Sequence, residues 1–446
     1  MQHVTTIRSM WRQFFSVWLP VFLTQLSLVL GSFFAAAMAG HHGRADLAGV
    51  AVGVNLWTPI LMTSIGLFMG VTPIISHLLG ANKTNHISTI IRQAVYLAIT
   101  IGVTVTIFGA VILHPLLDML SLQPEVHDIT YRFLLYIGLG IIPTFVSITL
   151  RNIVDSHGLT RLSLAIMTCG FFINIILNYC FIYGVGIFPE MGGAGTGVAI
   201  SLSNVFNCLA FLLLMAFFKP FSQYHLYTSK KIRTDIWIDQ LKIGLPIGCA
   251  NFLEISLFAI IGLLVTTYGT NIIAAHQAAN NFSNLAYTLP LSAGIATTIL
   301  CGYELGGQRQ KFALRYAYIA QSFTVIIAII LFCITFFHMN QIAKIYSSDA
   351  DMISLISTFV PFALGFIFAD ATGTPIQGAL RGYKDVRYIF YISFICYWLI
   401  GLGTGILFAH YFAFGPYGYW IGTITGLIAA SIAYNVRLLY LNRHLY

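Results

Sequence analysis

The sequence predicts an all-α integral membrane protein with twelve transmembrane helices, arranged as two six-helix lobes in a parallel repeat around a central cavity. Only 8% of its 446 residues are charged and 58% are hydrophobic, whereas about a quarter of the residues in a soluble domain are charged. A chain so poor in charge cannot cover a water-facing surface, so its outer surface must face lipid. The other two observations are a series of long apolar runs and a repeat that links the two halves of the chain.

The apolar runs are each long enough to cross a bilayer core of about 30 Å, which takes roughly 20 helical residues. They are continuously apolar, whereas the strands of a membrane barrel would alternate. In chain order the predicted spans are approximately 14–38, 48–76, 92–115, 129–150, 162–184, 194–218, 241–268, 272–301, 314–337, 352–378, 387–410 and 417–441. The first run is too long for the apolar part of a signal peptide, and it is predicted to be a span.

The basic residues predict the orientation of these spans. Of the 22 Lys and Arg residues, all but Arg44, Arg132 and Lys344 fall in or near the loops of one side. Because cytoplasmic loops carry the excess of Lys and Arg in membrane proteins, both termini are predicted to be cytoplasmic. The net charge of +8 is therefore a topology signal, and no nucleic-acid partner is expected.

The two halves of the chain share a pattern of prolines, glycines and basic residues at helix ends and turns. The same distance of 226 positions, which we call the repeat offset, separates Pro20 from Pro246, Gly80 from Gly306, Lys83 from Arg309, and Arg161 from Arg387. Because each half holds six spans, both halves cross the membrane in the same direction, a parallel repeat that many transporters use.

The repeat predicts an N-terminal lobe over residues 1–218, a cytoplasmic linker over 219–240 and a C-terminal lobe over 241–446. The linker carries the basic run 229–233. This run is interpreted as part of a solvated connection, with a lipid-headgroup patch as the alternative.

Two acidic residues, Glu254 and Asp370, remain inside apolar spans after the loops are assigned. A carboxylate at mid-bilayer costs about 2.5–3.5 kcal/mol on insertion scales. Glu254 lies about 15 Å along a helix from Gly244, and Asp370 lies at a similar depth before Arg381. No buried Lys or Arg is expected to pair with them. They are therefore predicted to bind Na⁺ or protons; the alternative is a pair of protonated carboxyl groups that only pack.

Amide side chains form two pairs at a spacing of four residues, which places both members on one helix face. The pairs are Gln277 with Asn281, and Asn174 with Asn178. They are predicted to line a substrate cavity, and hydrogen bonding between helices is the alternative. His276 is expected to be structural.

Prolines and glycines inside the spans predict local geometry. Pro246, Pro290 and Pro375 each remove a backbone donor and predict helix kinks. The glycine-rich stretches 192–197 and 401–405 are interpreted as sites of close helix packing.

The sequence lacks the motifs of the common enzyme classes. It has no Gly-x-x-x-x-Gly-Lys-Ser/Thr loop, no His-Glu-x-x-His, no Gly-x-Ser-x-Gly and no Cys-x-x-Cys, so no ATP hydrolysis, catalytic metal or nucleophile is expected. We expect a protein that is not an enzyme and that carries no cofactor beyond a coupling ion.

Several segments together resemble the multidrug and toxic compound extrusion (MATE) transporters of the NorM type. The resemblance covers essentially the whole chain. The segments that carry it are Met38-Ala39-Gly40, 174–178, 244–248 with 252–254, Ala274-Ala275-His276-Gln277, and Asp370 with 378–385.

The resemblance implies an exporter of organic cations that is driven by inward movement of Na⁺ or H⁺. Glu254 and Asp370 fall on the family's cation positions, and Gln277 falls near its substrate surface. Two positions depart from the family pattern. Ala35 stands where the family usually has an Asp, and Phe366 stands where it has a Tyr, which keeps an aromatic group beside the cavity.

The expected function is thus cation-coupled multidrug antiport by alternating access, with Na⁺ favoured over H⁺. The expected partners are cationic drugs and dyes, the coupling ion and membrane lipids. The expected location is the inner or plasma membrane of a bacterium, and the expected state is a monomer. The alternatives are a flippase for a lipid-linked or other amphipathic substrate, an intramembrane enzyme and a channel.

Overall fold

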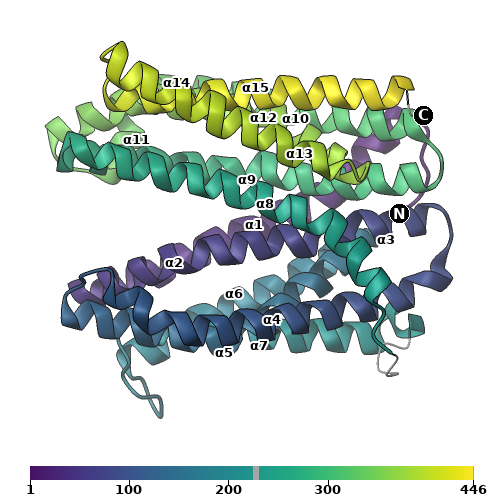
Figure 1. Cartoon of the computed structure of the whole chain (residues 1–446), viewed down its shortest axis with the longest axis horizontal. Helices are drawn as coiled ribbons and strands as arrows, with labels where there is room; N and C mark the ends of the chain where they lie inside the picture. Colours follow the sequence, from purple (N-terminus) through teal and green to yellow (C-terminus); the bar gives the residue numbers. More distant parts are fainter. Residues whose placement is uncertain (225–230, 445–446) are drawn as a thin grey trace. The chain divides into compact units, whose positions relative to one another are not determined.

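The computed structural model describes residues 1–224 and 231–444, and this part of the chain is helical and contains no strand. Twelve of its helical segments are long and apolar enough to cross a membrane. Figure 1 shows the helices, which are α1 (Ile7–His42), α2 (Arg44–Met69), α3 (Val71–Gly80), α4 (Ile87–Asp118), α5 (Pro124–Ser156), α6 (Thr160–Tyr183), α7 (Ala194–Phe217), α8 (Thr234–Val265), α9 (Thr270–Gly306), α10 (Gln310–Phe337), α11 (Met339–Tyr346), α12 (Ala350–Gly382), α13 (Val386–Ser393), α14 (Gly403–Ile406) and α15 (Pro416–His444).

The twelve predicted spans are confirmed, and most of the helices extend beyond the apolar runs. The predicted span 14–38, for example, lies within α1, which begins at Ile7 and ends at His42. Hydropathy marks the part of a helix that lipid surrounds, whereas the polar ends continue the same backbone hydrogen bonding. The π-helical segments Phe394–Leu402 (η4) and Leu407–Tyr411 (η5), which flank α14, were not predicted.

The internal repeat is reproduced in the backbone. The repeat offset carries the first residue of α5 onto the first residue of α12, and the last residue of α5 onto the last residue of α12. The turn after α3 and the turn after α9 are also alike, since Asn82 and Gln308 adopt left-handed φ angles of 55° and 59°. These equivalent bounds and turns confirm that the two halves are copies of one fold.

The chain forms two compact units, which we call the N-terminal unit (Leu23–Gly248) and the C-terminal unit (Met1–Phe22 with Cys249–Tyr446). This grouping differs from the predicted lobes 1–218 and 241–446. The chain passes from one unit to the other inside α1 and again inside α8. The first part of α1 packs with the C-terminal helices; Trp18, for example, contacts Phe323 of α10 with ring centroids 4.6 Å apart.

Each unit is organised around one central helix. In the N-terminal unit α5 packs against α2, α4 and α7, and in the C-terminal unit α12 packs against α9, α10 and α15. Glycines allow the closest of these contacts. A Cβ atom on Gly378 of α12 would collide with the backbone of Gly294 on α9, and the Thr298 hydroxyl donates a hydrogen bond to the Gly378 carbonyl at 2.9 Å.

The two glycine-rich stretches pack as predicted. A Cβ atom on Gly422 of α15 would collide with the backbone of Gly401 and Gly405, and one on Gly197 would collide with the Phe133 carbonyl of α5. Both stretches therefore serve helix packing.

The connection between α7 and α8 is held against the N-terminal unit at both ends that the structure describes. The Tyr224 hydroxyl is 2.9 Å from Nε2 of buried His157, whose Nδ1 is 2.7 Å from the Ile153 carbonyl. Because a carbonyl only accepts, Nδ1 carries the proton and Nε2 accepts from Tyr224. At the other end, Gln93 binds the backbone of Lys231 and Arg233. Ser229 and Lys230 of the predicted basic run lie outside the described residues.

We expect the Gly378→Ala substitution to destabilise the protein by about 1–3 kcal/mol, because the added methyl group meets backbone that cannot move aside. Thermal unfolding in detergent measures the effect. The matched control is Gly262→Ala on α8, where an added Cβ meets no atom within 4 Å. Equal melting temperatures for the two variants would contradict the close packing of α9 and α12.

We expect the free energy of unfolding to fall as the pH drops from about 6.5 to about 4. Burial lowers the pKa of His157 to about 4, so in this pH range the unfolded chain binds a proton at this residue and the folded chain does not. The full effect is about 3 kcal/mol. Melting temperatures of the wild type and of His157→Gln across this pH range test it. The variant should lose less stability on acidification, and parallel curves would show that His157 does not contribute.

Candidate cation site

The two predicted carboxylates both belong to the C-terminal unit. Glu254 lies on α8, and Asp370 lies on α12, where its side chain is 4% exposed. The two groups are close enough to interact electrostatically. The fold therefore brings together residues that are more than a hundred positions apart in the sequence.

A small cavity lies beside Asp370. It has room for about one water molecule. Its lining includes Thr374 and Gln377 of α12, Tyr397 of η4, and Ser431 and Tyr434 of α15. Oδ2 of Asp370 faces no hydrogen-bond partner among the described residues. Because an unpartnered buried carboxylate is costly, this oxygen needs a proton, a water molecule or a cation.

Helix α12 is supported by α10 directly after Asp370. Pro375 has no N–H, so the Ala371 carbonyl one turn earlier loses its helical donor. The Thr324 hydroxyl of α10 donates to that carbonyl at 2.7 Å, and Gln321 donates to the next carbonyl, of Thr372, at 2.8 Å. The proline thus opens the helical hydrogen bonding beside the cavity without leaving a buried carbonyl unpaired.

The expectation that no buried base accompanies the carboxylates is wrong. Arg381 lies in the last turn of α12 and is only 5% exposed. Its guanidinium donates to Gln377 Oε1 at 2.9 Å and interacts electrostatically with Glu254, which is also hydrogen-bonded to Tyr287. Arg381 lies beyond the apolar run 352–378, which predicts a position in or near a loop, whereas α12 remains helical and packed as far as Gly382.

Two further buried carboxylates lie outside the predicted apolar spans and are not among the predicted site residues. Asp155 of α5 is 7% exposed and interacts with Arg151 one turn earlier, while Glu304 of α9 is 1% exposed and lies 3.3 Å from Arg309 Nε.

The predicted face of α9 is present, and its buried neighbour has the predicted structural role. Gln277 and Asn281 both lie on the exposed side of α9, whereas His276 is buried. Trp420 Nε1 lies 3.1 Å from Nδ1 of His276, and Asn280 lies 2.9 Å from Nε2. Because an indole N–H only donates, Nδ1 of His276 accepts from Trp420, and the Asn280 atom beside Nε2 is Nδ2.

The other predicted cavity residues, Asn174, Asn178 and Phe366, belong to different units. In the N-terminal unit, the Asn178 amide donates to the Asn174 backbone and side-chain oxygens at 2.9 and 3.0 Å, and Ala35 is a buried residue. In the C-terminal unit, Phe366 is 4% exposed and packs edge-on against Phe258. Phe366 therefore lies in the packed interior and does not line the cavity beside Asp370.

We expect Arg381→Gln to destabilise the protein by about 3–5 kcal/mol, because it leaves the Glu254 charge without its basic neighbour. The double variant Arg381→Gln with Glu254→Gln should recover part of this loss. Melting temperatures of the two single variants and the double variant in detergent form a cycle, with exposed Arg387→Gln as the control. Strictly additive effects would show that the two groups do not interact.

The family model MatE matches residues 20–180 and again 246–407. The two matches begin at Pro20 and Pro246, a pair that the repeat offset links. The family model therefore covers both halves of the chain.

Curated relatives match over nearly their whole length. The chain is 42% identical over 445 residues to a protein of Oceanobacillus iheyensis named "Probable multidrug resistance protein NorM", and the match covers 99% of each chain. It is 40% identical over 444 residues to the protein of the same name from Bacillus subtilis, covering 99% of this chain and 98% of that one.

Solved structures share the fold. One described as the outward-facing conformation of a multidrug resistance MATE family transporter has a TM-score of 0.88 at 19% identity, covering 99% of this chain and 100% of that one. The eukaryotic MATE transporter AtDTX14 has a TM-score of 0.85 at 18% identity, covering 96% of this chain and 95% of that one. With twelve apolar helices in this fold and a family model matching both halves, the chain is a multi-pass membrane protein that belongs to the MatE family.

Proposed function

We propose that the chain is a secondary active efflux transporter that exports lipophilic organic cations in exchange for Na⁺ or H⁺. The observation that carries the proposal is the pair Glu254 and Asp370 inside apolar helices, with an unpartnered Asp370 oxygen beside a small cavity. The names of the relatives, which describe multidrug resistance proteins, support the same class of function.

The proposed mechanism is alternating access between two six-helix lobes around a central cavity. In the outward-facing state Glu254 and Asp370 take up the coupling ion. Their neutralisation weakens the attraction that holds a cationic drug, which leaves to the outside. Antiport requires that drug and coupling ion are not carried together, and competition for one acidic site meets this requirement.

The amide side chains and the acidic pair have separate roles in this proposal. Gln277 and Asn281, with Asn174 and Asn178, contribute polar contacts to the substrate. Gln377 and Ser431, whose side chains carry neutral oxygens, line the same small cavity as Asp370. Carboxylate and amide oxygens together suit a hard cation, so Na⁺ is favoured over H⁺.

A second candidate function is the flipping of a lipid-linked or other amphipathic substrate. The observation in its favour is the buried base Arg381, which resembles the basic group that a pyrophosphate would need. Its position beside Glu254 and its bond to Gln377 favour the cation exporter, because the charge of Arg381 is already compensated.

The proposed location is the plasma membrane of a bacterium with both termini in the cytoplasm. The asymmetric distribution of Lys and Arg supports the orientation, and the bacterial relatives support the location. A monomer is sufficient, because one chain holds both copies of the repeat.

We expect Glu254→Gln and Asp370→Asn each to reduce gradient-driven transport by tenfold or more, because each removes a negative charge from the coupling site. Ethidium transport in inside-out vesicles with an imposed Na⁺ or pH gradient measures the effect. The matched control is Asp351→Asn, which neutralises an exposed carboxylate on the same helix as Asp370.

The gradients also separate the coupling ions. Wild-type transport that responds to neither gradient would overturn the antiport proposal, and undiminished coupled transport by Glu254→Gln would overturn the site assignment. A response to only one gradient identifies the ion.

A further inference from the structure

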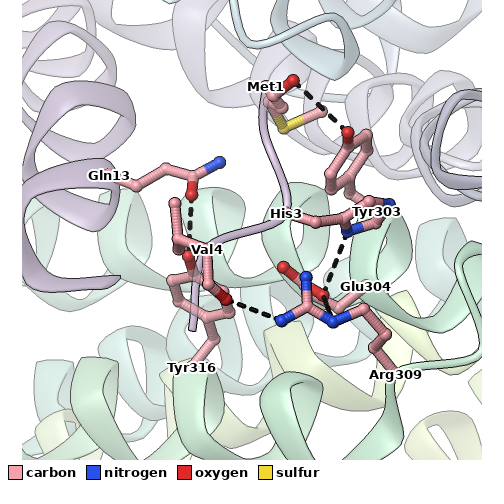
Figure 2. Close-up of polar contacts among 8 residues, drawn as sticks. All are labelled: Met1, His3, Val4, Gln13, Tyr303, Glu304, Arg309 and Tyr316. Atoms are coloured by element: carbon pink, nitrogen blue, oxygen red, sulfur yellow. Dashed lines mark hydrogen bonds and ion pairs between the residues drawn. The ribbon is translucent and has the colours of Figure 1, made fainter. Parts of the chain in front are cut away.

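The segment that precedes α1 lies on the turn between α9 and α10. Figure 2 shows the contacts: the Tyr303 hydroxyl donates to the Met1 carbonyl at 3.3 Å, and Arg309 Nη2 donates to the Val4 carbonyl at 2.7 Å. The His3 ring stacks on Tyr303 with centroids 4.5 Å apart. Side chains at the α9–α10 turn thus contact the backbone of residues 1–4 and the imidazole ring of His3.

The centre of this contact is Glu304, which the proposed transport mechanism does not use. Its side chain is 1% exposed, and Oε2 lies 3.3 Å from His3 Nδ1 and 3.3 Å from Arg309 Nε. Oε1 has no hydrogen-bond partner among the described residues. Because a buried carboxylate needs compensation, the N-terminal segment supplies part of what keeps Glu304 in place.

The contact continues into α1. The Tyr316 hydroxyl of α10 donates to Gln13 Oε1 at 2.9 Å, and one turn further Trp18 packs on Phe323. Residues 1–18 are therefore attached along the C-terminal unit from the α9–α10 turn onward. Helix α1 leaves this unit after Phe22.

The N-terminal unit has a related but chemically different arrangement. The residues before α8 are held by the Gln93 side chain, which donates to the Lys231 carbonyl at 3.0 Å and accepts from the Arg233 N–H at 3.0 Å. At the repeat position of Glu304 the N-terminal half has Leu78. Each unit thus holds the segment that precedes the helix it shares, by the Gln93 amide in the N-terminal unit and by side chains around the buried Glu304 carboxylate in the C-terminal unit.

We propose that residues 1–6 form a strap, that Glu304 is its positioning residue, and that release of the strap sets the rate of the transport cycle. The last part rests on the proposed function. Any rearrangement between the units must pass through α1 and α8, where the chain crosses from one to the other. A strap that fixes the first part of α1 to the α9–α10 turn opposes such a rearrangement.

The strap is tested by labelling a thiol introduced at its centre. In inside-out vesicles, the half-buried Val4→Cys position is exposed to a membrane-impermeant maleimide, and mass spectrometry of the N-terminal peptide gives the labelling rate. Adding Glu304→Gln should raise the rate tenfold or more. The milder His3→Gln should raise it about threefold, which keeps the test valid if Glu304→Gln folds poorly. Exposed Glu125→Gln is the matched control, and equal rates in all variants would overturn the strap.

Its effect on transport is measured separately, on Glu304→Gln and His3→Gln without the thiol. We expect ethidium turnover to rise threefold or more, with an unchanged apparent affinity for the coupling ion because Glu254 and Asp370 are intact. Unchanged or lower turnover together with faster labelling would overturn the proposal that release of the strap sets the rate of transport. A wild type without gradient-driven transport would instead contradict the proposed function, while the labelling result would still decide on the strap.

Discussion

The cost of burying charge among apolar helices is the constraint on which the rest of the structure depends. Several of the buried or partly buried carboxylates have a basic neighbour; Asp155 has Arg151, Glu254 has Arg381 and Glu304 has Arg309. Asp370 differs, because the charged group that acts on it is another carboxylate, Glu254. The same physical requirement that makes the other acids part of the scaffold leaves Asp370 as the position where an external cation or proton is needed.

The repeat explains why the scaffold is symmetric while the chemistry is not. Helices α5 and α12 have equivalent bounds and equivalent roles as central helices. At the repeat positions of Glu254 and Asp370, however, the N-terminal half has Leu28 and Thr144. The helix bounds and turns are alike in the two halves, whereas the charged positions differ. This divergence concentrates the candidate coupling groups in one unit, in agreement with Ala35 at the position where a carboxylate is usual.

The sequence was sufficient to predict the helices, the repeat and the two candidate carboxylates, because hydropathy, turn residues and misplaced charges are local signals. It was insufficient at helix ends. Arg381 and Glu304 lie just beyond apolar runs, where composition alone resembles a loop, although the backbone there is still helical and packed. The grouping of the first part of α1 with the C-terminal unit was also beyond the sequence, since no local pattern records which distant helix a segment contacts.

The exchange of half-helices between the units has a consequence for biosynthesis. His3 and Glu304, which meet in the strap, are separated by 301 positions, so the residues around His3 find their partners only after the chain has been synthesised as far as Glu304. The N-terminal unit is complete only after synthesis has reached Gly248. Neither half of the coding sequence therefore encodes a self-sufficient body. The C-terminal unit can therefore assemble only after its later helices have been inserted. In a chain truncated before those helices, residues 1–22 would lack the helices against which they pack.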